Sequence, residues 1–215
     1  DVTFVAQWVE KEDFSTGYWV LVTDASELNN DDYVVIAAAD YDVAMKSYES
    51  GNNCKQVEVT KANNLLTWNE NVGVFQLDKS DENYTFQDVN TEQYLYAAGG
   101  TSSNYLRAAD EIPTDENAKK YTWTISIADN KATIKAQIED NGENKARNTI
   151  MYNANEGING QLFSCYASSQ KDIALYKYVT ELPTPTPDYT RIVTAGNFGT
   201  ICIPYGSSNY TGAEF

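Results

Sequence analysis

The feature that most constrains this chain is a set of four short segments that recurs three times along it. The middle copy spans residues 84–128, and similar sets of four occur at residues 33–78 and 132–177. The final segment of each copy is centred on a large apolar residue, and these residues are Phe75, Trp123 and Leu175. Because the first segments and the last ones both recur at nearly constant spacing, the pattern predicts three copies of one structural unit.

Each segment has the alternation of a β-strand. In residues 121–127 every second position is apolar and would share one face: Tyr121, Trp123, Ile125 and Ile127. No stretch of the chain keeps a helical apolar period over several turns. Three four-stranded units closing around a common axis would bury one core and leave few open edges. We therefore expect an all-β barrel of three four-stranded units, with a β-sandwich or another barrel as the alternative.

Three four-stranded units in series resemble the β-trefoil, the fold of ricin-type lectins, fibroblast growth factors and Kunitz-type inhibitors. The resemblance covers residues 33–178 and implies a β-trefoil domain at residues 25–178, with extra β-strands at both ends of the chain. The Gln-x-Trp triplet of many ricin-type repeats is absent, because the matching triplets read Val-Phe-Gln, Thr-Trp-Thr and Ala-Leu-Tyr. The resemblance therefore concerns the architecture and leaves a ricin-type sugar site unsupported.

The segment that leads into the first unit carries a second resemblance. Residues 19–35 are similar to the stretch that precedes such modules in large secreted proteins of gut anaerobic bacteria. In those proteins the modules are accessory domains. The resemblance implies a secreted or cell-surface protein with further domains, whose signal peptide is absent from this chain.

The two ends of the chain differ from the repeated units. Residues 1–24 predict a pair of strands, at residues 3–9 and 18–23, joined by a polar segment. Residues 179–190 are rich in Pro and Thr, which predicts an extended and fairly stiff linker. Residues 191–215 are too few to bury a core of their own. We expect them to form part of a second β-module or to dock as strands on the N-terminal pair.

Composition excludes several classes of function. The chain has 31 acidic and 15 basic residues, and its net charge of −16 would repel phosphate backbones and anionic lipid. Nucleic-acid binding is therefore not expected. No run of about 18 apolar residues is present, so membrane insertion is not expected either. Histidine is absent, which excludes Ser-His-Asp and Cys-His catalysis and His-ligated zinc. The three cysteines, Cys54, Cys165 and Cys202, cannot all pair within one chain. The sequence does not decide whether Cys54 and Cys165 form a disulfide.

Most of the carboxylates fall in turns, where a solvated surface is the simplest interpretation. A glycosidase needs a pair of them, one with its pKa raised by an apolar pocket, and the sequence marks no such pair. Residues 110–117 and 139–144 gather carboxylate and amide oxygens of the kind that bind Ca²⁺, without the regular calcium-loop pattern. No cofactor is therefore expected, and Ca²⁺ in one of these acidic loops is the alternative.

Three pairs of residues have the side-chain types of a sugar site, in which an aromatic ring lies beside amide or carboxylate groups. They are Asp40 with Tyr41, Asn104 with Tyr105, and Tyr152 with Asn153. The pairs occur at roughly comparable places in the three units, where a trefoil would carry repeated shallow sites. The alternative is that these tyrosines cover the ends of the barrel.

The leading hypothesis is a non-catalytic module of a secreted or cell-surface protein that binds a glycan or a protein ligand. It follows from the threefold unit, the Pro- and Thr-rich linker, and the absence of histidine and of a catalytic motif. A structural spacer module with no ligand of its own is the second hypothesis. A carboxylate-dependent glycoside hydrolase is the third.

Overall fold

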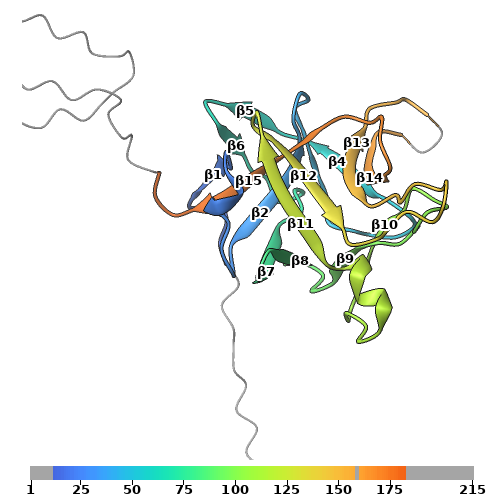
Figure 1. Cartoon of the computed structure of the whole chain (residues 1–215). Helices are drawn as coiled ribbons and strands as arrows, with labels where there is room; N and C mark the ends of the chain where they lie inside the picture. The colour runs from blue at the N-terminus through green and yellow to red at the C-terminus, as the bar shows by residue number, and fades with distance from the viewer. Residues whose placement is uncertain (1–11, 158–159, 183–215) are drawn as a thin grey trace, which may run out of the picture. The chain divides into compact units, whose positions relative to one another are not determined.

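A computed structural model describes residues 12–157 and 160–182 of the chain (Figure 1). The chain divides into two compact parts, Asp1–Glu181 and Leu182–Phe215. The described residues other than Leu182 belong to the first part. The strand expected at residues 3–9 and the segment 191–215 lie outside the described residues, as does most of the expected linker.

Short β-strands and two short 3₁₀ helices make up the described elements. In chain order they are β1 (Tyr18–Leu21), η1 (Ala25–Glu27), β2 (Tyr33–Ala38), β3 (Val43–Met45), β4 (Cys54–Glu58), β5 (Thr60–Ala62), β6 (Leu65–Thr67), β7 (Phe75–Ser80), β8 (Asn83–Asp88), β9 (Tyr94–Ala97), β10 (Leu106–Ala109), η2 (Glu116–Lys120), β11 (Trp123–Ala128), β12 (Lys131–Ala136), β13 (Thr149–Asn153), β14 (Leu162–Tyr166) and β15 (Ile173–Val179). None of the described helices is long and apolar enough to cross a membrane.

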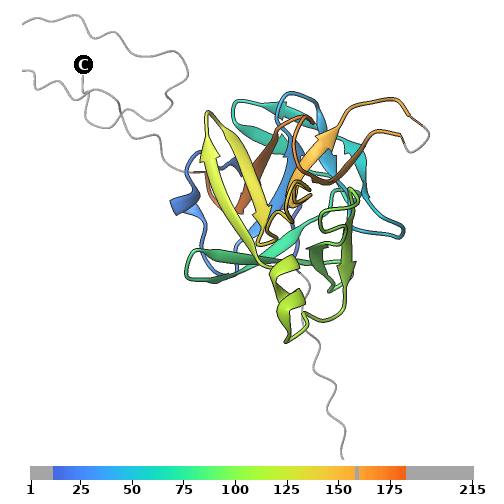
Figure 2. The same ribbon diagram turned by 45° about the vertical axis from the view of Figure 1, so that its right-hand side comes forward.

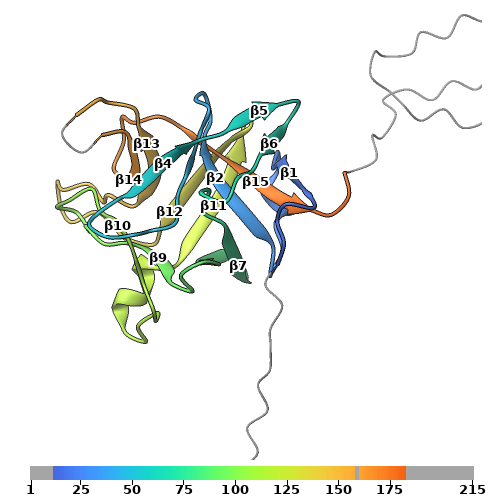
Figure 3. The ribbon, with the colours of Figure 1, turned by 180° about the vertical axis from the view of Figure 1, so that it is seen from behind.

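Six of these strands close into a barrel. They are the first and last strands of the three units, and they pair in a ring: β2 with β7, β7 with β8, β8 with β11, β11 with β12, β12 with β15, and β15 with β2. The two inner strands of each unit form the hairpins β3–β4, β9–β10 and β13–β14. These hairpins gather at one end of the barrel, on the right in Figure 1 and on the left in Figure 3. A six-stranded barrel capped by three hairpins is a β-trefoil, so the predicted fold class is confirmed.

The barrel is filled by the residues expected to close each unit. Phe75, Trp123 and Leu175 are fully buried in one core cluster. The ring of Phe86 meets that of Trp123 edge-on, with centroids 6.2 Å apart. The indole Nε1 of Trp123 donates to the backbone oxygen of Leu95 at 3.3 Å, so this large ring is buried without an unpaired donor. The prediction that Trp123 is a core residue is confirmed.

A second apolar cluster covers the outside of the barrel at β2 and β15. β1 pairs with β15 and with β6, so it is part of the same sheet as the repeated units. The hairpin β5–β6, inserted between β4 and β7, was not expected from the sequence. Because β2 is covered on both faces, its residues Tyr33–Ala38 form a nearly continuous apolar run rather than an alternating one. The ring of Phe14 is central to this cluster, with its centroid 5.0–6.2 Å from those of Trp19, Tyr33, Trp68 and Tyr178.

The two described cysteines are both free and buried. Cys54 lies on β4, and Cys165 lies on β14, which pairs with β4. Burial raises the pKa of the Cys165 thiol. The structure therefore contains these residues as protonated thiols in the core.

One carboxylate, Asp88 at the end of β8, is fully buried. Its Oδ1 accepts hydrogen bonds from Ser47 Oγ at 3.1 Å and from the backbone N–H groups of Asn90 and Thr91 at 2.8 and 3.2 Å. Burial raises the pKa of Asp88 and outweighs these hydrogen bonds, which lower it.

We expect Trp123→Ala to lower the free energy of unfolding by about 3–5 kcal/mol, because it removes a buried ring and leaves a cavity. Tyr18→Ala is the control, since Tyr18 is 43% exposed on β1 and its loss should change stability by about 0.5 kcal/mol or less. Urea unfolding followed by circular dichroism measures both. Equal losses for the two variants would contradict the central position of Trp123.

The stability difference between the wild type and Asp88→Asn should depend on pH. Because the pKa of Asp88 is raised in the folded state, the folded protein binds this proton more tightly than the unfolded chain. The contribution of Asp88 to stability is therefore largest below the carboxyl pKa of the unfolded chain and is lost as pH rises through the folded pKa. Asn does not titrate, so the difference should shift in favour of the wild type as pH falls. Urea unfolding at a series of pH values measures this shift, and a constant difference would contradict it.

Candidate functional site

Asp40 and Tyr41 lie in the connection between β2 and β3. Asp40 is exposed and forms an ion pair with Lys131, whose Nζ is 3.4 Å from Asp40 Oδ2 and 2.8 Å from Asp172 Oδ2. The ring of Tyr41 packs against the ring of Tyr152 with centroids 5.3 Å apart. Asp40 therefore joins two units electrostatically, while Tyr41 covers the core beneath it.

Tyr152 is not an exposed sugar platform, and this part of the prediction is corrected. The residue is 1% exposed, packs against Phe163, and its hydroxyl forms a hydrogen bond with Gln56 Oε1. Asn153 is partly exposed, and its Oδ1 accepts from the backbone N–H of Asn155 at 3.0 Å. Tyr152 is buried because β13 turns this position toward the core, whereas the sequence shows only that β13 alternates.

The three predicted pairs are not equivalent under the threefold arrangement. Asp40 lies between the first and second strands of its unit, and Asn104 lies between the second and third strands of its own. Tyr152 lies within the second strand of the third unit. The structure brings Tyr41 and Tyr152 into contact, and it places Asn104 and Tyr105 in a separate environment.

Asn104 and Tyr105 end a tight loop that joins β9 to β10. Its shape depends on Gly99, because a Cβ built there would lie 1.7 Å from the backbone oxygen of Ser103. The loop closes with a hydrogen bond from the Ala98 N–H to the Tyr105 oxygen at 3.0 Å. Asn104 is tied to the third unit, since its backbone oxygen accepts from Ser164 Oγ at 2.7 Å.

The outer face of the β9–β10 hairpin gathers aromatic rings around an arginine. Arg107 lies directly opposite Tyr96 in the antiparallel pair, and Ala109 lies opposite Tyr94, so these side chains share one face. The guanidinium of Arg107 lies over the ring of Tyr105, 5.1 Å from its centroid. We call this surface the aromatic–arginine face, and its residues, all partly exposed, are Tyr94, Tyr96, Tyr105 and Arg107.

The rings of this face are held in place from beneath and from the side. Leu95, Ala97 and Leu106 point to the other face of the hairpin and are fully buried in the core. The ring of Tyr96 stacks on that of Tyr121 with centroids 4.6 Å apart and an angle of 14° between the planes. Tyr121 caps η2, which lies beside the hairpin in Figure 2. The face is therefore rigid and already formed.

Polar groups lie at both ends of the face. At one end Gln93 Nε2 donates to Asp110 Oδ1 at 2.8 Å, and these residues flank Tyr94 and Ala109. At the other end Arg107 Nε donates to Asn52 Oδ1 at 2.9 Å. Amides, a carboxylate and a guanidinium beside tyrosine rings can together bind hydroxyl groups and an apolar sugar face.

A second arginine approaches the same loop from the third unit. Arg147 Nη1 donates to Asn104 Oδ1 at 2.7 Å, and its backbone N–H donates to the Gly100 oxygen at 2.9 Å. Its Nε is buried, and no described residue accepts a hydrogen bond from it. Asn104 and Tyr105 are consecutive residues that each contact one of the two arginines.

Asn104 and Tyr105 were predicted from the sequence as candidate ligand-binding residues, whereas Tyr94, Tyr96 and Arg107, which lie on the same hairpin, were not. The signal was present, because the two strands read Tyr-Leu-Tyr and Tyr-Leu-Arg with leucine at the central position. In an antiparallel hairpin with both leucines inward, the flanking residues of the two strands must share the outer face. Arg147 carried no such signal, because it lies outside the strands and reaches the loop only through the packing of two units.

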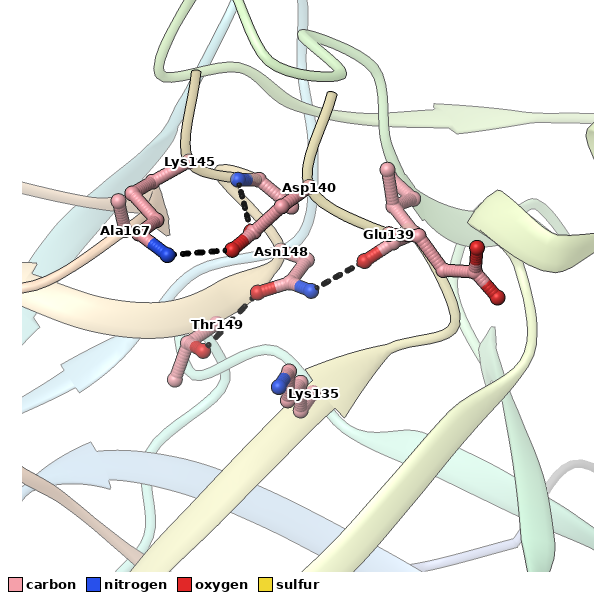
Figure 4. A pocket seen from close by; sticks show the side chains of 9 residues that line it. Lys135, Glu139, Asp140, Lys145, Asn148, Thr149 and Ala167 are labelled. Carbon is pink, nitrogen blue, oxygen red and sulfur yellow. Dashed lines mark hydrogen bonds and ion pairs between the residues drawn. The ribbon is translucent and has the colours of Figure 1, made fainter. Parts of the chain in front are cut away.

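A polar pocket of about 460 Å³ lies beside the loop between β12 and β13 (Figure 4). It is lined in part by Lys135, Glu139 and Asp140. Asp140 accepts from the Ala146 backbone N–H at 2.9 Å and pairs with Lys145 Nζ at 2.7 Å. These contacts, the Ala146 N–H foremost, lower the pKa of Asp140. Asp140 is therefore held as a carboxylate and is unsuited to donate the proton that glycoside hydrolysis requires.

This pocket includes part of one loop considered for Ca²⁺. The Oδ1 of Asp140 accepts from the Ala146 backbone N–H, and its Oδ2 accepts from Lys145 Nζ. Across residues 12–157 and 160–182, no group of three or more Cys, Asp or Glu side chains is arranged to hold a metal ion.

Gly99→Ala should disturb the loop that carries Asn104 and Tyr105. The added Cβ would overlap the Ser103 backbone, so we expect the free energy of unfolding to fall by about 1–3 kcal/mol. Amide hydrogen exchange should also become faster across residues 98–105. Gly157→Ala is the matched control, because a Cβ there meets no atom within 4 Å. Unchanged exchange in Gly99→Ala would contradict the close approach.

Comparisons with known proteins are limited to distant structural similarity. No protein-family model matches the chain, and no curated protein matches it. A lectin from Polyporus squamosus, solved with the epitope Neu5Acα2-6Galβ1-4GlcNAc, is 11% identical with a TM-score of 0.46, over 69% of this chain and 49% of the lectin. A GlcNAcα1-4Gal-releasing endo-β-galactosidase from Clostridium perfringens is 9% identical with a TM-score of 0.45, over 69% of this chain and 32% of the enzyme.

A designed 3-fold symmetric protein, ThreeFoil, is 17% identical with a TM-score of 0.44, over 66% of this chain and 96% of its own. This chain therefore spans about a third to a half of the lectin and the galactosidase, and nearly all of the designed protein. Its own ring of strand pairs identifies it as a β-trefoil.

Proposed function

We propose that the protein is a non-catalytic module that binds a glycan on the aromatic–arginine face. The observation that carries the proposal is the grouping of three tyrosines and Arg107, partly exposed, on the outer face of one hairpin. Aromatic rings of this kind pack against the apolar C–H face of a sugar, and the groups around them bind its hydroxyls.

The rigidity of the face supports binding. Tyr96 is fixed by its stack on Tyr121, and Arg107 is fixed by Asn52 and by the ring of Tyr105. Side chains that are already ordered lose little conformational entropy when a ligand binds. The hydrogen-bonding groups at both ends, Gln93 with Asp110 and Asn52, give the ligand a defined orientation.

A catalytic function is less well supported by the carboxylates. Hydrolysis requires an acid with a raised pKa that a substrate can reach. Asp88 has a raised pKa but is fully buried, and Asp140 borders a pocket but has a lowered pKa. Neither Asp88 nor Asp140 therefore combines a raised pKa with access for a substrate, as a proton donor must.

We also propose that this module acts outside the cell as part of a larger protein. The support is the resemblance of residues 19–35 to the lead-in of secreted accessory modules and the Pro- and Thr-rich composition of residues 179–190.

A protein ligand is the second candidate, because tyrosine and arginine are also the residue types that dominate protein interfaces.

A polysaccharide and glycan-array screen tests the proposal. Tyr94→Ala and Tyr105→Ala should each lower the affinity for a bound glycan by about five- to thirtyfold, since losing an aromatic contact costs about 1–2 kcal/mol. Tyr18→Ala removes a tyrosine that is 43% exposed on β1 and should leave the affinity unchanged.

Two results would contradict the proposal. If no glycan binds to the folded protein, the module is a spacer or binds a protein. If a chromogenic glycoside is turned over, and the turnover disappears when one Asp or Glu is replaced, the module is a hydrolase. Circular dichroism of each variant confirms that a loss of binding reflects the site.

A further inference from the structure

The two arginines of the described chain are unusual in their partners. All six ion pairs among residues 12–157 and 160–182 use lysine. Neither Arg107 nor Arg147 has a carboxylate within ion-pair distance, although the chain carries 31 acidic residues. Arginine is the residue best suited to bind carboxylates, so its lack of an acidic partner in such a chain points to another ligand.

Both guanidinium groups are held in place by neutral amides. Arg107 binds Asn52 Oδ1 through Nε and Nη2, and Arg147 binds Asn104 Oδ1 through Nη1. The neutral partners orient the cations and leave their charge uncompensated. Arg107 Nη1 and Arg147 Nη2 have no acceptor among the described residues, and Arg147 Nε is buried without one.

The ring of Tyr105, which lies next to these donors, could bind the sugar part of a glycan that carries an acidic group. Tyr105 lies under Arg107, and the neighbouring Asn104 is held by Arg147. A sugar packed beside Tyr105 would lie next to the Arg107 guanidinium, which could then bind an acidic substituent. The planar N–H fork of arginine matches the oxygens of a carboxylate or a sulfate group.

The charge of the whole chain makes this arrangement selective. A net charge of −16 repels polyanions from most of the surface, so an acidic glycan gains attraction where a cation without an acidic partner lies beside a surface that can bind the sugar. We propose that the aromatic–arginine face, together with Arg147, binds glycans that carry a carboxylate or sulfate group. This inference rests on the proposed glycan-binding function and specifies its ligand class.

Four soluble polysaccharides distinguish the chemistry. Dextran is neutral, dextran sulfate carries sulfate alone, hyaluronan carries carboxylate alone, and chondroitin sulfate carries both. Isothermal titration or biolayer interferometry with the full chain should show binding to at least one of the three anionic polymers and none to dextran. The affinity should fall as salt is added, because the interaction is between exposed charges.

Arg107→Gln and Arg147→Gln should each weaken binding to the preferred anionic polymer by about tenfold or more, the loss expected for a charged hydrogen bond. Lys171→Gln is the control of equal charge change, since Lys171 is exposed and lies outside the face. Arg107→Lys and Arg147→Lys keep the charge but lose the fork, and they should bind with intermediate affinity even if a glutamine variant is unstable.

Three results would overturn the inference. Binding to an anionic polymer that is unchanged in both arginine variants would show that the attraction lies elsewhere. Binding to neutral glycans that is lost in Tyr94→Ala but kept in both arginine variants would leave the glycan-binding function intact and remove its acidic ligand. Absence of binding to every polysaccharide would overturn both proposals.

Discussion

Closure of the six-stranded ring is the constraint on which the rest of this structure depends. The strands that join neighbouring units, such as β7 with β8 and β11 with β12, pair along their full length. The strands that close a single unit barely pair: β8 meets β11 at Tyr84 and Trp123, and β12 meets β15 at Ala132 and Ile173. Backbone hydrogen bonds alone would hold these junctions weakly. The buried side chains at and near them, foremost Trp123, supply the remaining cohesion through apolar burial.

The same core positions the candidate site. The inner residues of the β9–β10 hairpin, Leu95, Ala97 and Leu106, are buried against the barrel, which fixes the direction of every residue on the outer face. Gly99 allows the loop to turn tightly enough that Asn104 reaches Ser164 of the third unit. The aromatic–arginine face is therefore a consequence of packing between units, and its geometry is set before any ligand arrives.

Charge and burial divide the acidic residues of this chain into two groups. Exposed carboxylates such as Asp140 and Asp172 form ion pairs with lysine. Asp88 is taken into the core, where desolvation favours its protonated form. The two arginines differ from the paired lysines, because neutral amide side chains orient Arg107 and Arg147 and do not neutralise their charge. A ligand with an acidic group would neutralise the guanidinium charges of Arg107 and Arg147.

The sequence by itself determined the strands of the three repeated units, the threefold repeat and the burial of Trp123, because alternation and repetition can be recognised without knowing which strands are neighbours in space. It also pointed to Asn104 and Tyr105. It could not show that Tyr152 is buried or that Arg147 meets Asn104, and it gave no sign that β1 and β5–β6 cover the barrel. Alternation separates the two faces of a strand, but which face is covered depends on strands distant in the chain. Only the tertiary structure decided those contacts.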